Sequence, residues 1–271
     1  ETDNLIQTLE TYKPETIIHF AAKAYVGESK AIPLTYYQNN VAGTLSVLDA
    51  AARCGVKNFI FSSSCAVYGQ PETLPVTEET PINPISPYGR TKAVCEDIIK
   101  DHCSVNNMRF AILRYFNAAG AEPDSGIGES HDPETHLIPN IINSAISGTK
   151  FFIFGDKHPT PDGSCIRDFI HVTDLSLAHV LGIDYLNTEK QSITANVGTG
   201  RGNSIFEIVT ALRQHHNFNV KIERKQPRAG DPSEIFCNNA VAKNLLNWQP
   251  QKSDLKSIID DVIDWEKINN Q

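Results

Sequence analysis

Short apolar runs alternate with helical patterns through the first 116 residues of the chain. The apolar runs cover residues 16–22, 58–64 and 109–116, and helical patterns cover 33–54 and 87–103. Apolar runs of this length, separated by helices, are typical of βαβ units. The pattern therefore predicts an α/β fold built on a doubly wound parallel sheet.

The second half of the chain departs from this rhythm after residue 117. Residues 117–170 are rich in loops, and the patterns at 173–186 and 194–197 indicate a return to the sheet. We expect 1–117 with parts of 171–200 to form the larger domain, and 118–170 with 201–271 to form a smaller lobe over the carboxyl edge of the sheet. Further helices are predicted at 138–147, 204–216, 239–247 and 254–268, and further strands at 151–154 and 219–224.

Composition and charge exclude several classes of protein. The 271 residues are 40% hydrophobic with a formal charge of −8, which indicates a packed core and no basic face for nucleic acid. The sequence has no apolar stretch near the roughly 18–20 residues that span a membrane. The six cysteines form no CxxC pair, so we expect reduced thiols in a cytoplasmic protein. His19, His136, His171 and His179 have irregular spacings without an acidic pattern, so we predict no metal site.

Tyr88 and Lys92 form the most informative pair in the chain. They stand four residues apart after Ser86 and Pro87, which suit the N-cap and first turn of a helix, so the two side chains should share one helical face. A free tyrosine has a pKa of about 10, and a neighbouring cation favours the phenolate. We expect Lys92 to lower the pKa of Tyr88, and Ser64 at a strand end to hold a substrate alcohol. Such a site removes a proton from an alcohol while a cofactor accepts the hydride.

Several runs of residues resemble one known family. The runs are 61–64, 86–92, 114–117, 162–174 and 228–231, and the resemblance extends over the whole chain. The chain resembles the UDP-glucose 4-epimerases, a family within the extended short-chain dehydrogenases/reductases. The Arg-Asp-Phe-Ile-His run with Arg-x-Gly-Asp carries more weight than Tyr-x-x-x-Lys alone. The resemblance implies a Rossmann-like fold with NAD as the cofactor.

One segment of the family's pattern is absent from this sequence. The family opens with a strand and a Gly-rich turn that holds the NAD pyrophosphate at a helix N-terminus. The sequence has no such turn near Glu1. We therefore expect an N-terminally truncated sheet, a chain that is a fragment of a longer protein, and weakened binding of NAD.

The resemblance implies a role for each member of the Ser64, Tyr88 and Lys92 triad. The reaction interconverts UDP-galactose and UDP-glucose, because C4 is oxidised to a 4-keto sugar and then reduced on its opposite face. Tyr88 accepts the proton of the 4-hydroxyl while NAD accepts the hydride. Ser64 binds the 4-oxygen, and Lys92 binds the nicotinamide ribose. Further cofactor contacts are implied for Phe20, Ala21, Ala22, Lys23, Asn39 and Tyr115.

The UDP-sugar is expected to lie between the sheet edge and the second lobe. Arg167 and Arg228 are implied as ligands of the diphosphate, because a guanidinium donates two parallel hydrogen bonds to phosphate. Asp231 would accept hydrogen bonds from the ribose hydroxyls, and Leu137 and Phe154 would line the uracil pocket. The full set of implied substrate contacts is Ser64, Asn117, Leu137, Phe154, Arg167, Arg228, Asp231 and Ile235.

Several alternatives stay open from the sequence. A UDP-sugar 4-epimerase acting on N-acetylhexosamine or glucuronate substrates would share these motifs, although Ile235, of intermediate size, favours UDP-glucose and UDP-galactose. A catalytically impaired binding protein derived from a dehydrogenase is a second alternative. Leu137 and Phe154 could be ordinary core residues, and Arg167 could pair with Asp168 alone.

The resemblance also implies a homodimer. Its interface would form from helices 33–54 and 87–103, whose outer faces contain Ala42, Leu45, Val94 and Ile98. These apolar side chains are equally consistent with the core of a monomer.

Overall fold

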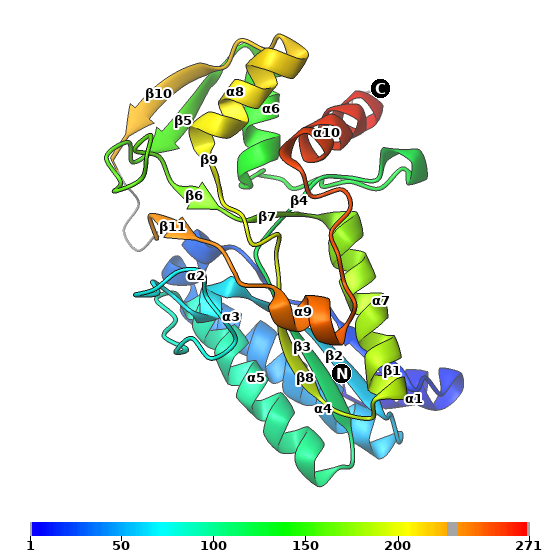
Figure 1. Cartoon of the computed structure of the whole chain (residues 1–271). Coiled ribbons are helices and arrows are strands. Elements are labelled where there is room, and N and C mark those ends of the chain that lie inside the picture. The colour runs from blue at the N-terminus through cyan, green and yellow to red at the C-terminus, as the bar shows by residue number, and fades with distance from the viewer. Residues whose placement is uncertain (1, 227–231, 270–271) are drawn as a thin grey trace.

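A four-stranded parallel sheet forms the centre of the larger part of the molecule (Figure 1). The computed structural model describes residues 2–226 and 232–269. The strand order is β1 (Thr16–His19), β2 (Asn58–Ser64), β3 (Arg109–Tyr115) and β8 (Ile193–Val197). All seven residues of β2 are buried, as expected for a strand inside a parallel sheet.

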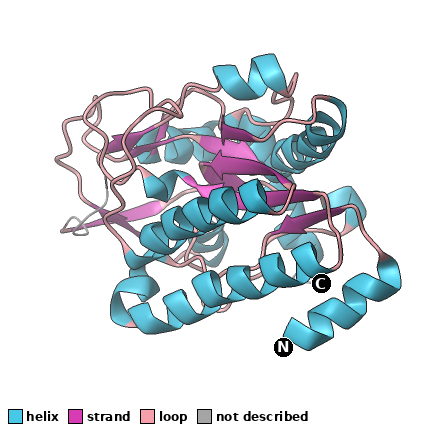
Figure 2. Ribbon diagram, turned by 90° about the horizontal axis from the view of Figure 1, so that it is seen from below, coloured by secondary structure: helices cyan, strands magenta, loops and turns pink. Residues whose placement is uncertain are grey.

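Helices cover both faces of this sheet, as Figure 2 shows from a second direction. Alternate residues of β2 point to opposite faces. Phe59 and Phe61 pack with α4 (Gly43–Arg53) and α5 (Pro87–Val105), whereas Ile60 packs with α7 (Val172–Thr188) and α9 (Ala240–Leu245). The predicted doubly wound α/β fold of the Rossmann type is therefore confirmed, and α1 (Thr2–Tyr12) packs against α4.

The region after β1 differs in detail from the sequence expectation. The strand predicted over 16–22 ends at His19, and α2 (Val26–Ala31) was not predicted. The helix predicted over 33–54 is divided into α3 (Pro33–Tyr36), a π-helix (Tyr37–Ala42) and α4. The π-helix contains the buried residue Asn40, whose side chain forms hydrogen bonds with the backbone of Lys23. Residues 20–25 therefore leave the sheet and run toward the π-helix.

A second part of the molecule lies above the carboxyl ends of the sheet strands in Figure 1. It contains α6 (Leu137–Ser147), α8 (Ile205–His216), α10 (Leu255–Asn269) and the parallel pair β5 (Lys150–Phe154) and β10 (Lys221–Lys225). These elements share one apolar core that includes Ile141, Leu212 and Ile259. The predicted helices and strands of this half therefore form, mostly with ends shifted by one or two residues.

Short strands join the two parts. β4 (Asn117–Ala119) pairs with β7 (Phe169–His171), and β6 (Ile166–Arg167) lies between β9 (Asn203–Ser204) and β11 (Glu234–Ile235). Two 3₁₀ turns complete the order, at Cys65–Val67 and Pro123–Ser125.

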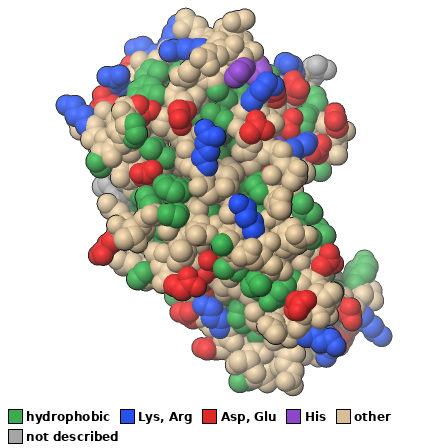
Figure 3. Space-filling model, viewed as in Figure 1, with side chains coloured by type: hydrophobic (Ala, Val, Ile, Leu, Met, Phe, Trp, Pro, Cys, Tyr) green, Lys and Arg blue, Asp and Glu red, His purple; other side chains and the backbone are tan. Residues whose placement is uncertain are grey.

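One face of the molecule is mixed in charge. On the face drawn in Figure 3, acidic and basic side chains are interspersed among apolar and neutral ones. Within residues 2–226 and 232–269, no helix has the length and apolar character needed to cross a membrane.

Candidate active site

The Ser64, Tyr88 and Lys92 triad assembles where β2 ends and α5 begins. Ser86 caps α5, since its hydroxyl accepts a hydrogen bond of 3.1 Å from the Gly89 backbone N–H. A Cβ on Gly89 would lie 2.4 Å from the Ala66 carbonyl oxygen. Glycine at this position therefore lets the first turn of α5 approach the end of β2, which brings Tyr88 to Ser64.

Tyr88 is buried and hydrogen-bonded to Ser64. Its side chain is 6% exposed, and Ser64 is 8% exposed. Burial raises the pKa of Tyr88, neighbouring Tyr115 raises it further, and the hydrogen bond with Ser64 opposes the rise. The expectation of a lowered pKa was therefore wrong for the protein alone, because desolvation of the phenol dominates.

Lys92 lies near the Tyr88 ring and bonds to the backbone of β2. Its ammonium lies 6.0 Å from the centre of the Tyr88 ring and donates a hydrogen bond of 2.6 Å to the Ser62 carbonyl oxygen. Burial lowers the pKa of Lys92 to about 8, while Cys95 and Glu96 act in the opposite direction. Among the described residues, the ammonium has this one hydrogen-bond acceptor, so two of its three N–H groups remain for a ligand.

A buried polar network that was not predicted from the sequence joins the elements that carry the triad. Ser63 donates a hydrogen bond of 2.6 Å to the Glu96 carboxylate, which also pairs with Arg114. Arg114 in turn donates to the Tyr68 hydroxyl, and Tyr68 donates to the Asn196 side chain. The network links β2, α5, β3 and β8, the elements that position the site.

The segment after β1 lies beside this site as an exposed turn. Phe20 is 57% exposed, and its ring lies 4.7 Å from that of His179. Asn40 receives a hydrogen bond of 2.8 Å from the Lys23 backbone N–H and donates one of 3.0 Å to the Lys23 carbonyl oxygen. Asn39, the residue predicted from the sequence, is exposed and donates to the Asn40 side chain.

The remaining predicted cofactor residues surround the same edge of the sheet. Ala21 is exposed, and Ala22 and Lys23 are half-buried. Tyr115 ends β3 and is the register partner of Ser64. An open backbone turn beside a buried cation is an arrangement that can bind a ligand carrying ribose hydroxyls.

Arg167 and Ile235 approach the triad from the second part of the molecule. They are register partners in β6 and β11, and Arg167 lies close enough to Cys65 to oppose the rise in its pKa. The Asp168 carboxylate accepts hydrogen bonds from Thr199 and from the Gly200 backbone N–H. It is therefore not reserved for an ion pair with the Arg167 guanidinium. Asn117 begins β4, where its backbone N–H donates 2.9 Å to the Asp168 carbonyl oxygen.

Ile235 is more deeply buried than a pocket wall requires. It is 4% exposed and packs in an apolar cluster with Val67, Tyr68 and Phe116. Its packing is therefore established, and its influence on substrate size stays a prediction.

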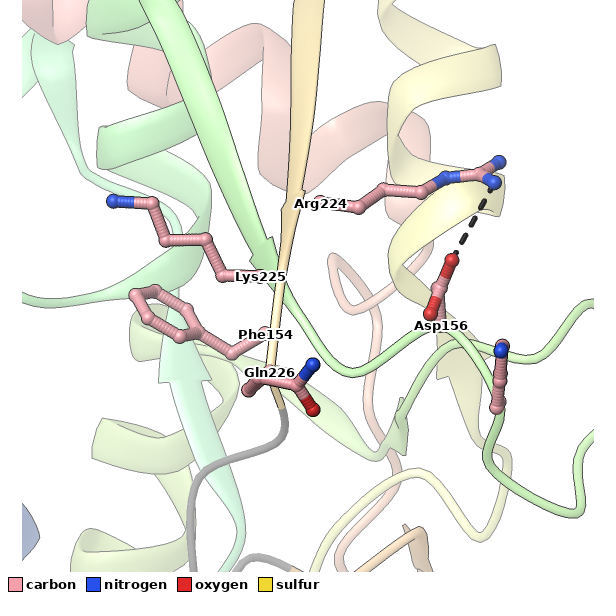
Figure 4. A pocket seen from close by; sticks show the side chains of 6 residues that line it. Phe154, Asp156, Arg224, Lys225 and Gln226 are labelled. Carbon is pink, nitrogen blue, oxygen red and sulfur yellow. Dashed lines mark ion pairs between the residues drawn. The ribbon is translucent and has the colours of Figure 1, made fainter.

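Phe154 lines a pocket of about 710 Å³ at the ends of β5 and β10 (Figure 4). The other walls include Arg224, Lys225 and Gln226, and Arg224 pairs with Asp156 over 3.4 Å. Leu137 is the first residue of α6 and packs against the apolar core of that part of the molecule. Arg228 and Asp231, predicted to bind the diphosphate and the ribose, lie outside the described residues.

Comparison with known proteins assigns the chain to a family. Residues 1–198 match the model of the NAD dependent epimerase/dehydratase family, and the chain belongs to that family.

Within this family, the similarity is to UDP-glucose 4-epimerases. The chain is 43% identical over 272 residues to the UDP-glucose 4-epimerase of Rhizobium meliloti (strain 1021), covering 100% of this chain and 83% of that protein. The structure of the UDP-glucose 4-epimerase from Brucella ovis in complex with NAD superimposes with a TM-score of 0.93 at 46% identity, over 96% of this chain and 80% of the other. The structure of the UDP-glucose-4-epimerase from Stenotrophomonas maltophila with bound NAD and formylated UDP-arabinopyranose superimposes with a TM-score of 0.96 at 34% identity. This match covers 100% of this chain and 81% of the other.

Proposed function

We propose that the chain is an NAD-dependent UDP-glucose 4-epimerase, which interconverts UDP-galactose and UDP-glucose through a 4-keto sugar. The observation that carries the proposal is the meeting of Ser64, Tyr88 and Lys92 at the carboxyl edge of a parallel sheet, in a chain 43% identical to such an enzyme.

NAD, when bound, supplies the hydride acceptor and donor for C4 of the sugar. Lys92, with two N–H groups to spare, and the turn at 20–23 fit a cofactor of this type. Asn40 holds that turn by both backbone groups of Lys23, so the turn is preorganised. Phe20, Ala21, Ala22, Lys23, Asn39 and Tyr115 are the proposed remaining contacts.

The triad moves the proton that accompanies each half-reaction. Tyr88 accepts the proton of the sugar 4-hydroxyl and later returns it, and Ser64 holds the same oxygen by a hydrogen bond. Because burial raises the pKa of Tyr88, the phenolate must be stabilised when the site is loaded. The ammonium of Lys92, 6.0 Å from the centre of the ring, is a cation placed to contribute.

The substrate is proposed to lie between the triad and the second lobe. Arg167 would bind the diphosphate, Asn117 would contact the sugar, and Phe154 and Leu137 would bound the uracil site. The position of Arg167 near Cys65, next to Ser64, supports this orientation. Arg228 and Asp231 complete the proposed set, and Ile235 is proposed to limit the room beside the sugar.

The proposal also assigns a role to each part of the molecule. We propose that 1–117 with parts of 171–200 bind NAD, and that 118–170 with 201–271 bind the UDP-sugar. Separate apolar cores beside the sheet and around α6, α8 and α10 support this division.

A homodimer is proposed through α4, α5 and the adjoining π-helix. Leu45 and Val94, on the helices that pack on one face of the sheet, are 48% and 39% exposed. Sedimentation should give a dimer for the parent and a monomer for the Leu45→Glu/Val94→Glu double variant. A parent that sediments as a monomer at micromolar concentration would contradict the proposal.

A cytoplasmic location is also proposed, and it is supported by the six free cysteines.

Turnover tests the function directly. The chain is incubated with NAD and UDP-galactose, and UDP-glucose is measured by chromatography. Tyr88→Phe should lower the rate by about 10²–10⁴-fold, because the general acid–base group is lost. Tyr12→Phe is the matched control, since Tyr12 is 79% exposed on α1. Near-full activity of Tyr88→Phe would refute the mechanism.

A further inference from the structure

Four side chains with metal-binding atoms meet in the loop before α6. Glu129, His131, Glu134 and His136 each offer one ligand atom, and these four atoms all lie within 4.8 Å of one another. His131 Nδ1 lies 2.6 Å from Glu129 Oε1, and His136 Nδ1 contacts the same oxygen. His131 Nδ1 is also 3.9 Å from Glu134 Oε1.

We propose that Glu129, His131, Glu134 and His136 bind one divalent transition-metal ion, for which Zn²⁺ is the best match. Two imidazole nitrogens and two carboxylate oxygens suit Zn²⁺, whereas Mg²⁺ and Ca²⁺ prefer oxygen ligands throughout. Tetrahedral Zn²⁺ with bonds of about 2.0–2.2 Å places its ligand atoms about 3.4 Å apart, so the cluster needs only small side-chain rotations.

Charge in the cluster favours a cation. Glu129 and Glu134 bring two carboxylates together, and their ligand oxygens lie within 4.8 Å of the two imidazole nitrogens and of each other. A divalent ion placed among these four atoms would offset the negative charge of both carboxylates.

Surrounding residues hold the ligands in place. The backbone N–H groups of Thr135 and His136 donate 2.6 and 2.7 Å hydrogen bonds to Glu134 Oε1. Trp265 of α10 donates 2.8 Å to the Glu129 carbonyl oxygen, and its ring lies so close to Gly128 that a Cβ there would be 2.3 Å from it. Such outer contacts orient metal ligands and raise affinity.

The site lies between the loop, the start of α6 and the segment before α2. The Tyr25 ring, just before α2, lies 5.5 Å from the His131 ring and 6.2 Å from the His136 ring. His136 occupies the N-cap position of α6, without a side-chain capping hydrogen bond, and Leu137 follows it directly. Four protein ligands leave no open position on a tetrahedral ion, so the metal would be structural and would fasten the loop to α6. The expectation of no metal site compared His136 with histidines far along the chain, whereas its neighbours in the cluster lie within the same eight loop positions.

Metal binding to the untagged, chelator-stripped chain tests the proposal. Calorimetry should give one equivalent of Zn²⁺ per chain, no binding of Mg²⁺, and a higher melting temperature with Zn²⁺. Glu129→Gln and His131→Gln/His136→Gln should lose the bound equivalent and the thermal shift, with unchanged circular dichroism. His215→Gln, an exposed histidine at the end of α8, is the matched control and should bind as the parent does.

Co²⁺ distinguishes this cluster from the cysteines. The Co²⁺ form should absorb in the visible region without a sulfur-to-cobalt charge-transfer band. A sulfur band, parental binding by the Glu129→Gln variant, or no Zn²⁺ binding by the parent would each overturn the proposal.

Discussion

Arg114 on β3 and Glu96 on α5 form a buried bidentate ion pair beneath the triad. Arg114 Nη2 lies 2.6 Å from Glu96 Oε2, and Arg114 Nε lies 3.0 Å from Oε1. The two side chains are 4% and 2% exposed. Because α5 also carries Tyr88 and Lys92, the pair fixes the helix that bears these two residues to the sheet.

Removing one partner of this pair should be more harmful than removing both. Glu96→Ala leaves a buried guanidinium uncompensated and should lower the free energy of unfolding by about 3–5 kcal/mol. The Glu96→Leu/Arg114→Met double variant should lose less free energy of unfolding than Glu96→Ala alone, because neither charge is then buried without its partner. Urea unfolding measures both. Asp49→Ala, which breaks the exposed Arg53–Asp49 pair on α4, serves as control and should have little effect. An equally mild Glu96→Ala would show that the network does not hold the helix.

Activity should fall as the pH rises through about 8. Burial lowers the pKa of Lys92 to about 8, so above this pH the folded protein loses the ammonium proton that the ligand contacts need. The rate of UDP-glucose formation should be measured from about pH 6.5 to 9.5. In Lys92→Arg the guanidinium stays charged throughout. Its residual activity should lack the alkaline fall, and an identical fall in both proteins would exclude Lys92 as its source.

Acid should destabilise the fold partly through His19. Burial lowers the pKa of His19 to about 4, with the charge of Lys92 adding to the effect, whereas the unfolded residue titrates near 6.5. The unfolded state therefore binds more protons between these values, and stability that is fully present above pH 6.5 is lost as the pH falls toward 4. Between about pH 6.5 and 4, the free energy of unfolding of His19→Gln should therefore fall by about 2–3 kcal/mol less than that of the parent. Urea unfolding at several pH values tests this, and His215→Gln should keep the parental pH dependence.

Asn40, not Asn39, should be required for the turn after β1. Asn40→Ala removes both side-chain bonds to the Lys23 backbone and should cost about 1–3 kcal/mol of unfolding free energy. Asn39→Ala, at an exposed neighbour, should cost less than about 0.5 kcal/mol. Calorimetric titration with NAD should show weaker binding by Asn40→Ala. A larger loss of NAD affinity in Asn39→Ala would favour the direct contact predicted from the sequence.

Local sequence was sufficient for the scaffold of the site. The βαβ order, the cap at Ser86 and the four-residue spacing of Tyr88 and Lys92 are all confirmed by the structure. These features depend on neighbours in the chain, namely periodicity, capping and turn chemistry, which the sequence displays directly.

Contacts between distant residues determined the rest. The raised pKa of Tyr88 depends on burial by β2 and β3, and the choice of Asn40 over Asn39 depends on which amide turns toward Lys23. The Glu96–Arg114 pair joins residues 18 positions apart on different elements. The order of the elements and the placing of Tyr88 and Lys92 on one face of a helix after the Ser64 strand were thus determined by the sequence itself. Only the tertiary structure decided the electrostatics of the site, because desolvation and long-range pairing arise when the elements pack together.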